Sequence, residues 1–141
     1  MDASEKIPRE REVGPCPCGS DKRYDQCCML LHYGRSQPET AEDLMRSRYS
    51  AYYFRLVDYL VQSTHPDTRE PNLKAEYESN IDQLFWRYLN IVGSSKGTPT
   101  DKVGKVEFIA GYVGSTKPEE LHERARFKRF KGTWKYLDNK G

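Results

Sequence analysis

The stretch CPCGSDKRYDQCC, from Cys16 to Cys28, contains every cysteine of this 141-residue chain. The cysteines form two pairs, C-x-C and C-C, with eight residues between them. Two ligand pairs joined by a short loop are typical of structural zinc sites, where four thiolates surround Zn²⁺ at about 2.3 Å. The spacing therefore predicts that Cys16, Cys18, Cys27 and Cys28 bind one structural Zn²⁺, in a closed shell that leaves no position for a reactive water.

Disulfides, free thiols and an iron–sulfur cluster are the alternatives to zinc. Adjacent cysteines such as Cys27 and Cys28 bridge only through a strained ring. Cross-pairing would staple one short loop and leave the rest of the chain without a bridge, unlike a secreted disulfide framework. Residues 1–13 are charged and lack the apolar run of a signal peptide. The usual iron–sulfur spacing, C-x₂-C-x₂-C, is absent. Zinc in a cytoplasmic protein is the favoured interpretation.

The same stretch resembles the SEC-C motif, a short zinc-binding segment named after the tail of the bacterial translocation ATPase. The positions that match are Cys16, Pro17, Cys18, Gly19, Ser20, Lys22, Tyr24, Cys27 and Cys28. Asp21 stands where the motif usually has Gly, and Asp tolerates left-handed backbone better than most residues. In the ATPase this motif docks on a chaperone and on the ribosome, so the resemblance implies a protein partner, with Lys22, Arg23 and Tyr24 as candidate contact residues.

Further along the chain, the sequence TAEDLMRSRYSAYYFRLVDYLVQST, residues 40–64, predicts one long helix. Thr40 is the expected N-cap, with Asp43 three residues later. The pair His65-Pro66 ends the helix, because the residue before a proline avoids helical backbone. One face repeats apolar residues at a spacing of three to four: Leu44, Met45, Tyr49, Tyr52, Leu56, Val57 and Leu60. A second, shorter helix is predicted over residues 72–84.

From residue 85 onward the apolar period changes from 3.6 to two. Four segments alternate apolar and polar residues and are separated by glycine-bearing turns. These are FWRYLNIV (85–92), KVEFIAGYV (105–113), ELHERARFKRF (120–130) and TWKYLD (133–138). Helices followed by a run of antiparallel strands predict an α+β fold, with the helices gathered on one face of the sheet.

The segments LMRSRYSAYYFRLVDYLVQSTHPDTR, VEFIAGYV, LHERARF and GTWKYLD, taken in this order, resemble the YchJ family. The resemblance implies an NTF2-like domain, in which a strongly curved, cone-shaped sheet wraps around the long helix. It divides the chain into a flexible tail (1–13), a SEC-C zinc knuckle (14–31), a linker (32–39) and an NTF2-like domain (40–141). The Pro- and Gly-bearing linker predicts that knuckle and domain unfold separately. The family implies no particular reaction.

The concave side of such a cone is the expected pocket. Six residues are candidates for it: Arg46, Tyr49, His65, Trp86, Glu107 and Glu123. Strand alternation places Glu123 on an apolar face, where a carboxylate needs a cation from the long helix (Arg46 or Arg48) or His65 as its partner. Such a pair would either lock the helix to the sheet or serve in acid–base chemistry. Trp86, Tyr88 and Trp134 are expected to fill the mouth of the cone.

No nucleophile elbow, phosphate-binding loop, metalloprotease motif or dinucleotide turn occurs in the sequence. Binding is therefore favoured over catalysis, with a small-molecule enzyme or ligand-binding protein as the alternative. Residues 117–141 carry eight Lys or Arg against four Asp or Glu, which suggests nucleic-acid or ribosome binding as a second alternative. That signal is weak, because the net charge is only +2. No apolar run is long enough to span a membrane.

Overall fold

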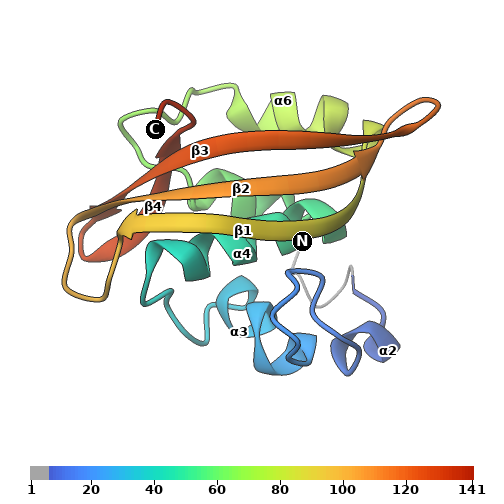
Figure 1. The fold of residues 1–141 in the computed structure, drawn as a ribbon, viewed down its shortest axis with the longest axis horizontal. Coiled ribbons are helices and arrows are strands. Elements are labelled where there is room, and N and C mark those ends of the chain that lie inside the picture. The colour runs from blue at the N-terminus through green and yellow to red at the C-terminus, as the bar shows by residue number, and fades with distance from the viewer. Residues whose placement is uncertain (1–6) are drawn as a thin grey trace.

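The computed structural model describes residues 7–141 and shows helices gathered under one curved sheet (Figure 1). The helical elements are α2 (Arg9–Glu12), η1 (Tyr24–Gln26), α3 (Cys28–His32), α4 (Ala41–Phe54), α5 (Val57–Gln62), α6 (Leu73–Asn80) and η2 (Ile81–Gln83). The strands are β1 (Phe85–Lys96), β2 (Val103–Val113), β3 (Pro118–Phe130) and β4 (Thr133–Asp138). The predicted α+β order of helices followed by four strands is confirmed.

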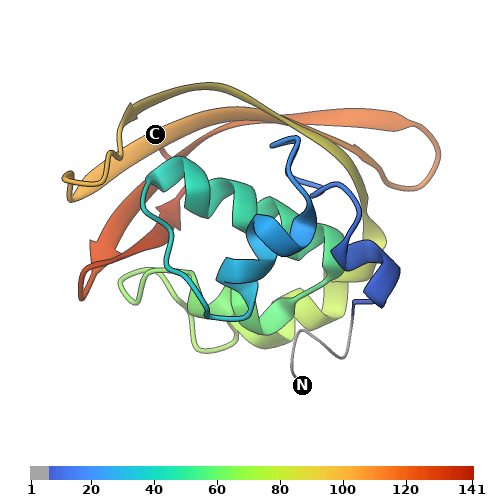
Figure 2. The same cartoon turned by 90° about the horizontal axis from the view of Figure 1, so that it is seen from below.

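The four strands form an antiparallel sheet in the order β1-β2-β3-β4. The register shifts between Trp86 and Tyr88, between Ile91 and Gly93, and again within β3. Such bulges bend a strand and increase its twist. Figure 2 shows the result, a sheet that arches over the helices, with α4 lying along its hollow side. This curved sheet around the long helix agrees with the cone that the family resemblance implies.

Helix α4 begins at the predicted N-cap. The Asp43 backbone N–H donates to Thr40 Oγ1 over 3.0 Å, which satisfies one of the amides that a helix start leaves unpaired. The Ala41 N–H donates to the carbonyl oxygen of Gly97, in the turn between β1 and β2, over 3.0 Å. The start of α4 is therefore fixed to the sheet as well as capped.

The single helix predicted over residues 40–64 is wrong, because the chain makes two helices there. Arg55 adopts left-handed backbone, with φ 60° and ψ 45°. The Leu56 N–H donates to the Ala51 carbonyl oxygen (2.8 Å) and the Arg55 N–H to that of Tyr52 (3.2 Å). This is the hydrogen-bond pattern of a Schellman C-cap, a motif that usually uses glycine at the left-handed position. The break lets α5 turn and pack against α4 and α6.

Strand alternation sorts the side chains of the sheet as the sequence predicts. On the hollow face, Phe108 of β2 lies opposite Glu123 of β3, and the neighbouring pair is Val106 and Ala125. On the outer face, Glu107 lies opposite Arg124. The hollow face carries the buried apolar residues and packs on α4, while the outer face is charged.

Of the three aromatic residues expected to fill the cone, Trp134 does so and is fully buried. Trp86 is half-buried at the cavity described below. Tyr88 is not a core residue. It is 38% exposed, its ring covers Gly111 on the neighbouring strand, and its hydroxyl donates to Glu120. The bulge beside Tyr88 shifts the alternation by one residue, which the sequence period did not reveal.

The knuckle and the NTF2-like domain share one hydrophobic core. Buried residues of the knuckle, including Tyr24, Cys28 and Met29, belong to the same cluster as Leu44 of α4 and the hollow face of the sheet. The Tyr24 ring packs on Phe54 with 4.8 Å between ring centroids. Because the core is continuous, we now expect the two parts to unfold together and not separately.

The predicted tail and linker also pack against the body. Residues 1–6 of the tail lie outside the described residues. Ile7 is 3% exposed, and Arg11 of α2 donates to the Tyr53 hydroxyl over 2.6 Å, so residues 7–13 are not a free tail. In the linker, Pro38 is buried, and the Glu39 carbonyl oxygen accepts a hydrogen bond from the indole of Trp134.

Candidate metal centre and cone cavity

A tight backbone loop presents the first cysteine pair. Pro15 and Arg23 form an antiparallel bridge, and the Cys16 N–H donates to the Lys22 carbonyl oxygen over 2.8 Å. Within the loop, Gly19 (φ 79°) and Asp21 (φ 68°) both take left-handed backbone. Asp21 thus adopts the conformation for which the motif commonly uses glycine. The second pair lies at the start of α3, which turns both thiols toward the loop.

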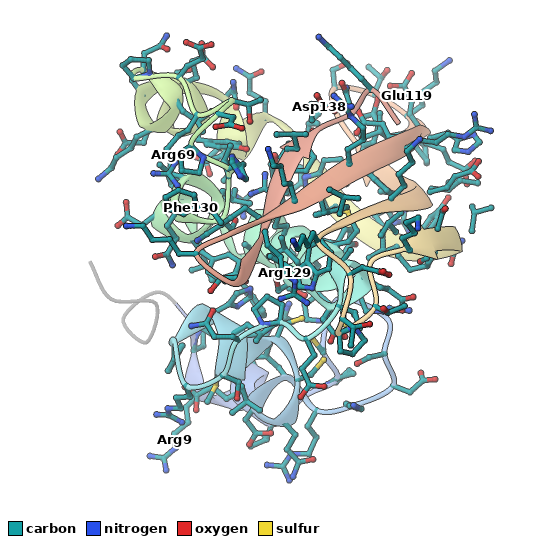
Figure 3. All side chains as sticks on the ribbon, turned by 90° about the vertical axis from the view of Figure 1, so that its left-hand side faces the viewer. Arg9, Arg69, Glu119, Arg129, Phe130 and Asp138 are labelled. Carbon is teal, nitrogen blue, oxygen red and sulfur yellow. The ribbon has the colours of Figure 1, made fainter. Side chains whose placement is uncertain are left out.

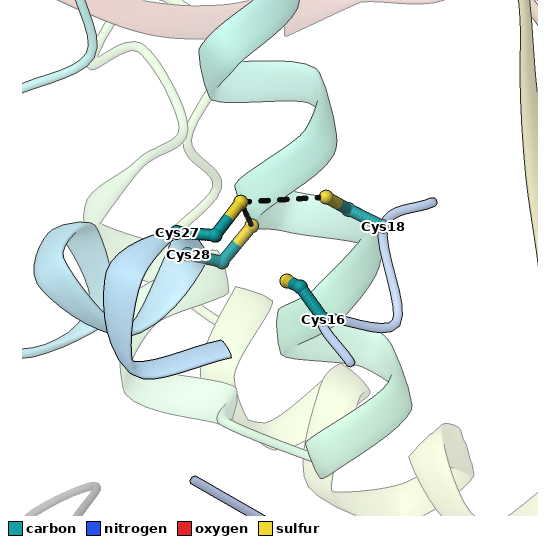
Figure 4. Close-up of side chains that lie close together, drawn as sticks. All are labelled: Cys16, Cys18, Cys27 and Cys28. Carbon is teal, nitrogen blue, oxygen red and sulfur yellow. Dashed lines mark hydrogen bonds between the residues drawn. The ribbon is translucent and has the colours of Figure 1, made fainter. Parts of the chain in front are cut away.

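The four sulfurs form a compact cluster (Figure 4), and all lie within 4.8 Å of one another. Cys27 Sγ is 3.7 Å from Cys18 Sγ and 3.9 Å from Cys28 Sγ. Thiolates at about 2.3 Å from a tetrahedral Zn²⁺ are about 3.8 Å apart along each edge. None of the four cysteines is in a disulfide. The donor set and its spacing therefore fit a thiolate metal such as zinc.

The thiols share their protons unequally. The hydrogen bond with Cys16 is the largest cause that lowers the pKa of Cys27, to about 6, and it also lowers the pKa of Cys18. The pKa of Cys16 and of Cys28 is raised, mainly through hydrogen bonds with the other thiols of the cluster. Part of the cluster is therefore ready to lose its protons, which a metal ion requires of its ligands.

The cation beside the metal centre comes from α4 and not from the knuckle. Arg46 donates from Nη1 to the Cys18 carbonyl oxygen over 2.6 Å and pairs with Glu42 at 3.1 Å. Arg23, in contrast, pairs with Asp25 in a bidentate geometry on the surface. Arg46 thus ties the first cysteine pair to α4, a role that sequence reasoning missed when it assigned this residue to the pocket.

A buried polar relay joins Tyr24 and α3 to α4. The Tyr24 hydroxyl lies 2.6 Å from His32 Nδ1, and His32 Nε2 lies 2.7 Å from the Ser47 carbonyl oxygen. Because that oxygen only accepts, Nε2 carries the proton and Nδ1 accepts from tyrosine. Burial lowers the pKa of His32 to about 4, so the ring is neutral near pH 7. The sequence signal for His32 was its place four residues after Cys28, on the same face of α3.

The candidate contact residues of the knuckle do not form one exposed surface. Tyr24 is fully buried in the core, so it cannot touch a partner. Arg23 is exposed but already paired with Asp25. Lys22 is exposed and remains as the candidate contact residue of the three.

The hollow side of the sheet contains a cavity of about 200 Å³. Residues of α4, all three long strands and β4 line it: Met45, Arg48, Tyr49, Tyr52, Trp86, Phe108, Ala110, Leu121, Glu123 and Tyr136. Three of the six candidate pocket residues, Tyr49, Trp86 and Glu123, come together here. The walls are mainly aromatic, with one cation and one carboxylate among them.

The other three candidates lie elsewhere. Arg46 contacts the knuckle, as described above. His65 is buried against the ring of Phe130, and its backbone N–H donates to the Tyr136 carbonyl oxygen, so it belongs to the edge beside β4. Glu107 lies on the outer face of the sheet, 2.6 Å from His122 Nε2. This pair holds the pKa of Glu107 below its usual value.

The predicted ion pair of Glu123 is not formed. Its carboxylate accepts a hydrogen bond from Asn139 over 3.5 Å, and within residues 7–141 no cation lies within ion-pairing distance of it. Arg48 lines the same cavity but donates to the Leu60 carbonyl oxygen (2.9 Å) and to Ser63 Oγ (2.6 Å). The spacing of Arg48, four residues from both Leu44 and Tyr52, is a sequence signal that could have placed it on the buried face.

The basic segment at the end of β3 is largely committed to the fold. Arg129 donates to the carbonyl oxygens of Asp101 (2.7 Å) and Pro99 (2.8 Å), and its guanidinium stacks on Trp134 at 4.4 Å (Figure 3 labels Arg129). Arg126 pairs with Asp138. These contacts leave little free charge for a phosphate backbone, which weakens the nucleic-acid alternative.

Comparison with known proteins agrees with this geometry. Residues 15–30 match the model of the SEC-C motif, and residues 40–139 match the model described as the YchJ middle NTF2-like domain. The chain belongs to the YchJ family. A UPF0225 protein of Streptomyces coelicolor is 39% identical to this YchJ-family chain over 124 residues, which cover 88% of the chain and 93% of the relative. One of Geobacter sulfurreducens is 36% identical, with coverage of 89% and 78%.

Two solved structures resemble this YchJ-family fold. The solution structure of a SEC-C motif protein from Rhodopseudomonas palustris has a TM-score of 0.80 and 32% identity, and covers 89% of this chain and 96% of its own. The crystal structure of a SEC-C motif protein from Psychrobacter arcticus has a TM-score of 0.77, 24% identity and coverage of 93% and 84%. Among residues 7–141, no helix combines the length and apolar character needed to cross a membrane.

Proposed function

We propose that this protein binds a small molecule in its cone, and that a structural zinc ion holds the SEC-C knuckle onto that cone. The observation that carries the proposal is the cavity of about 200 Å³, which contains Arg48 and Glu123 without an ion pair between them. A cone filled by aromatic residues would have favoured a scaffold. Aromatic walls with a few polar groups are typical of ligand sites.

Binding is favoured over catalysis because of what the cavity contains. Glu123 is the only carboxylate among its lining residues, and no histidine or cysteine lines it. His65 and His122 lie outside the cavity. Four reduced thiols suit a reducing compartment, so we place the protein in the cytoplasm.

The metal is proposed to be one zinc ion per chain. Purified protein, made without added metal, is expected to contain about one equivalent of zinc by elemental analysis. A variant with serine at positions 18 and 27 removes two ligands and is expected to lose it. A bound iron cluster, or a metal-free protein whose four thiols are oxidised, would contradict the assignment.

The cavity makes a separate prediction for nuclear magnetic resonance. Fragments with a single ring are expected to shift the indole signal of Trp86, which lines the cavity, and to leave that of the buried Trp134 unchanged. The substitution Ala110→Leu adds three carbons to a buried wall position and is expected to reduce this binding at least about tenfold. Equal binding by wild type and Ala110→Leu would show that the fragments bind outside the cone.

A protein partner at the knuckle is the second candidate function. A surface groove of about 630 Å³ separates the knuckle from the edge strand β1, and Pro15, Pro17 and Gly19 form part of its wall. Lys22 is exposed on the same loop. A photo-crosslinker at position 22 is expected to capture a specific protein in cells, whereas one at the exposed turn residue Lys131 is not. Identical products from both positions would count against a partner site at the knuckle.

A further inference from the structure

Arg48 is a buried cation without a carboxylate partner. Its side chain starts from α4, the residue is 3% exposed, and its guanidinium stacks on the Tyr136 ring at 4.5 Å. Within residues 7–141, its hydrogen bonds go to neutral acceptors, and no acidic group lies within ion-pairing distance. Buried charges are normally paired, because desolvation is costly. The cavity wall thus contains an uncompensated positive charge.

Two nitrogens of the Arg48 guanidinium keep an unused proton. Nη1 donates to the Leu60 carbonyl oxygen and to Ser63, and Nη2 uses one of its two protons for the Tyr77 hydroxyl at 3.2 Å. Nε donates to no acceptor among the described residues. Nε and the second proton of Nη2 therefore remain for a further acceptor.

Elsewhere in this chain the same guanidinium edge binds carboxylates in a bidentate geometry. Arg126 donates from Nε and Nη2 to the two oxygens of Asp138 over 2.7 and 2.5 Å. Arg23 does the same with Asp25 over 3.0 and 2.7 Å. Two parallel N–H donors match the two oxygens of a carboxylate in both spacing and charge. A carboxylate is thus the group that best completes Arg48.

The size and walls of the cavity limit the rest of the ligand. An apolar protein cavity of about 150 Å³ accommodates benzene, so about 200 Å³ leaves room for one ring with a small substituent. The rings of Tyr52, Trp86 and Phe108 line the space between the strands and α4. Flat aromatic walls favour a flat apolar body, because rings stack with offset or edge contacts.

We propose that the cone binds a single-ring carboxylate whose two oxygens accept hydrogen bonds from Nε and Nη2 of Arg48. This inference rests on the proposed ligand-binding function and names the class of ligand. Glu123 lines the same cavity with its own negative charge. It repels a second carboxylate, so it orients the ligand with its acid group toward Arg48 and its ring toward the aromatic walls.

Benzoate and benzamide are the matched probes for a test on the full-length, zinc-loaded protein. They share ring and volume, and differ in charge. Benzoate is expected to bind at least about tenfold more tightly, since hydrogen bonds from arginine to a charged carboxylate are stronger than those to a neutral amide. In nitrogen-resolved spectra it should also shift the Nε–H signal of Arg48. Equal affinities would overturn the carboxylate inference and leave ligand binding by the cone intact. Failure of both probes to shift the Trp86 indole would count against both proposals.

Two variants separate charge from geometry. Arg48→Lys keeps the positive charge but loses the two-donor edge, and is expected to weaken benzoate binding at least about tenfold. If that variant does not fold, the affinities of benzoate and benzamide for the wild-type protein still test the carboxylate inference. Glu123→Gln removes the repelling charge and is expected to tighten benzoate binding about threefold or more, without affecting benzamide. Unchanged or weaker benzoate binding by a folded Glu123→Gln protein would contradict the assigned orientation.

Discussion

Removal of zinc is expected to unfold the whole described chain in one transition, and not the knuckle alone. In small peptide sites at neutral pH, the apparent binding free energy of structural zinc is about 10–16 kcal/mol. The free energy of unfolding of a typical domain is only about 5–15 kcal/mol. Loss of the ion would also release Tyr24 and Met29 from the core that they share with α4. The relay from Tyr24 through His32 to Ser47 would break at the same time.

Thermal unfolding, with and without a strong chelator, measures this effect. Circular dichroism reports the helices, and the indole signal of Trp134 reports β4 in the NTF2-like domain. Both probes are expected to shift together to a much lower midpoint, and added zinc should restore them. A chelated protein that loses some helix but retains a native Trp134 signal and an unchanged midpoint would show that the NTF2-like domain folds alone.

The knuckle was predicted residue by residue because its determinants are local. All four cysteines of the chain lie within thirteen positions, so their thiols come together within one short segment. At Asp21 the backbone is left-handed, and Asp is a residue type that allows this conformation. The strands were also found, since alternation with a period of two is a property of each segment by itself. Some strands are longer than the apolar pattern predicted; β1, for example, continues through Ser94 to Lys96.

The end of α4 could not be read from the sequence. The left-handed C-cap at Arg55 has neither glycine nor asparagine, and the apolar spacing continues through Leu56 and Val57 into α5. The chain turns there so that α5 packs against α4 and α6, which is a tertiary effect. Propensity and period are weak guides where tertiary packing decides.

The cavity was only partly predictable for a similar reason. Alternation in β3 correctly places Glu123 on the hollow face, but its cation partner depends on the rotation of α4 and on competing acceptors. Arg46 lies two positions before Arg48, which turns it toward the knuckle, where Cys18 offers a carbonyl oxygen. Arg48 faces the sheet, but the carbonyl of Leu60 and the hydroxyl of Ser63 hold its guanidinium. Those acceptors exist only because the chain breaks before α5.

The substitution Gly104→Ala is expected to be among the most destabilising single changes in the chain. A Cβ at Gly104 would lie 2.5 Å from Gly97 Cα and 2.7 Å from Gly97 N, which are backbone atoms that cannot rotate away. Ala41 Cβ is also close, at 3.2 Å. Here the turn between β1 and β2 meets the start of α4, whose Ala41 N–H donates to Gly97. Separating them costs on the order of 3–5 kcal/mol.

Gly93→Ala is the matched control, because it makes the same chemical change on the neighbouring strand. Nothing lies within 4 Å of a Cβ at Gly93, and its backbone is not left-handed. Alanine also reduces the freedom of the unfolded chain, so this variant is expected to be neutral or more stable by about 0.5 kcal/mol. Urea unfolding of both zinc-loaded variants measures the difference. Equal stability of Gly104→Ala and Gly93→Ala would mean that α4 does not dock on the β1–β2 turn. The contact between the start of α4 and this turn would then not be one of those that hold the helices against the sheet.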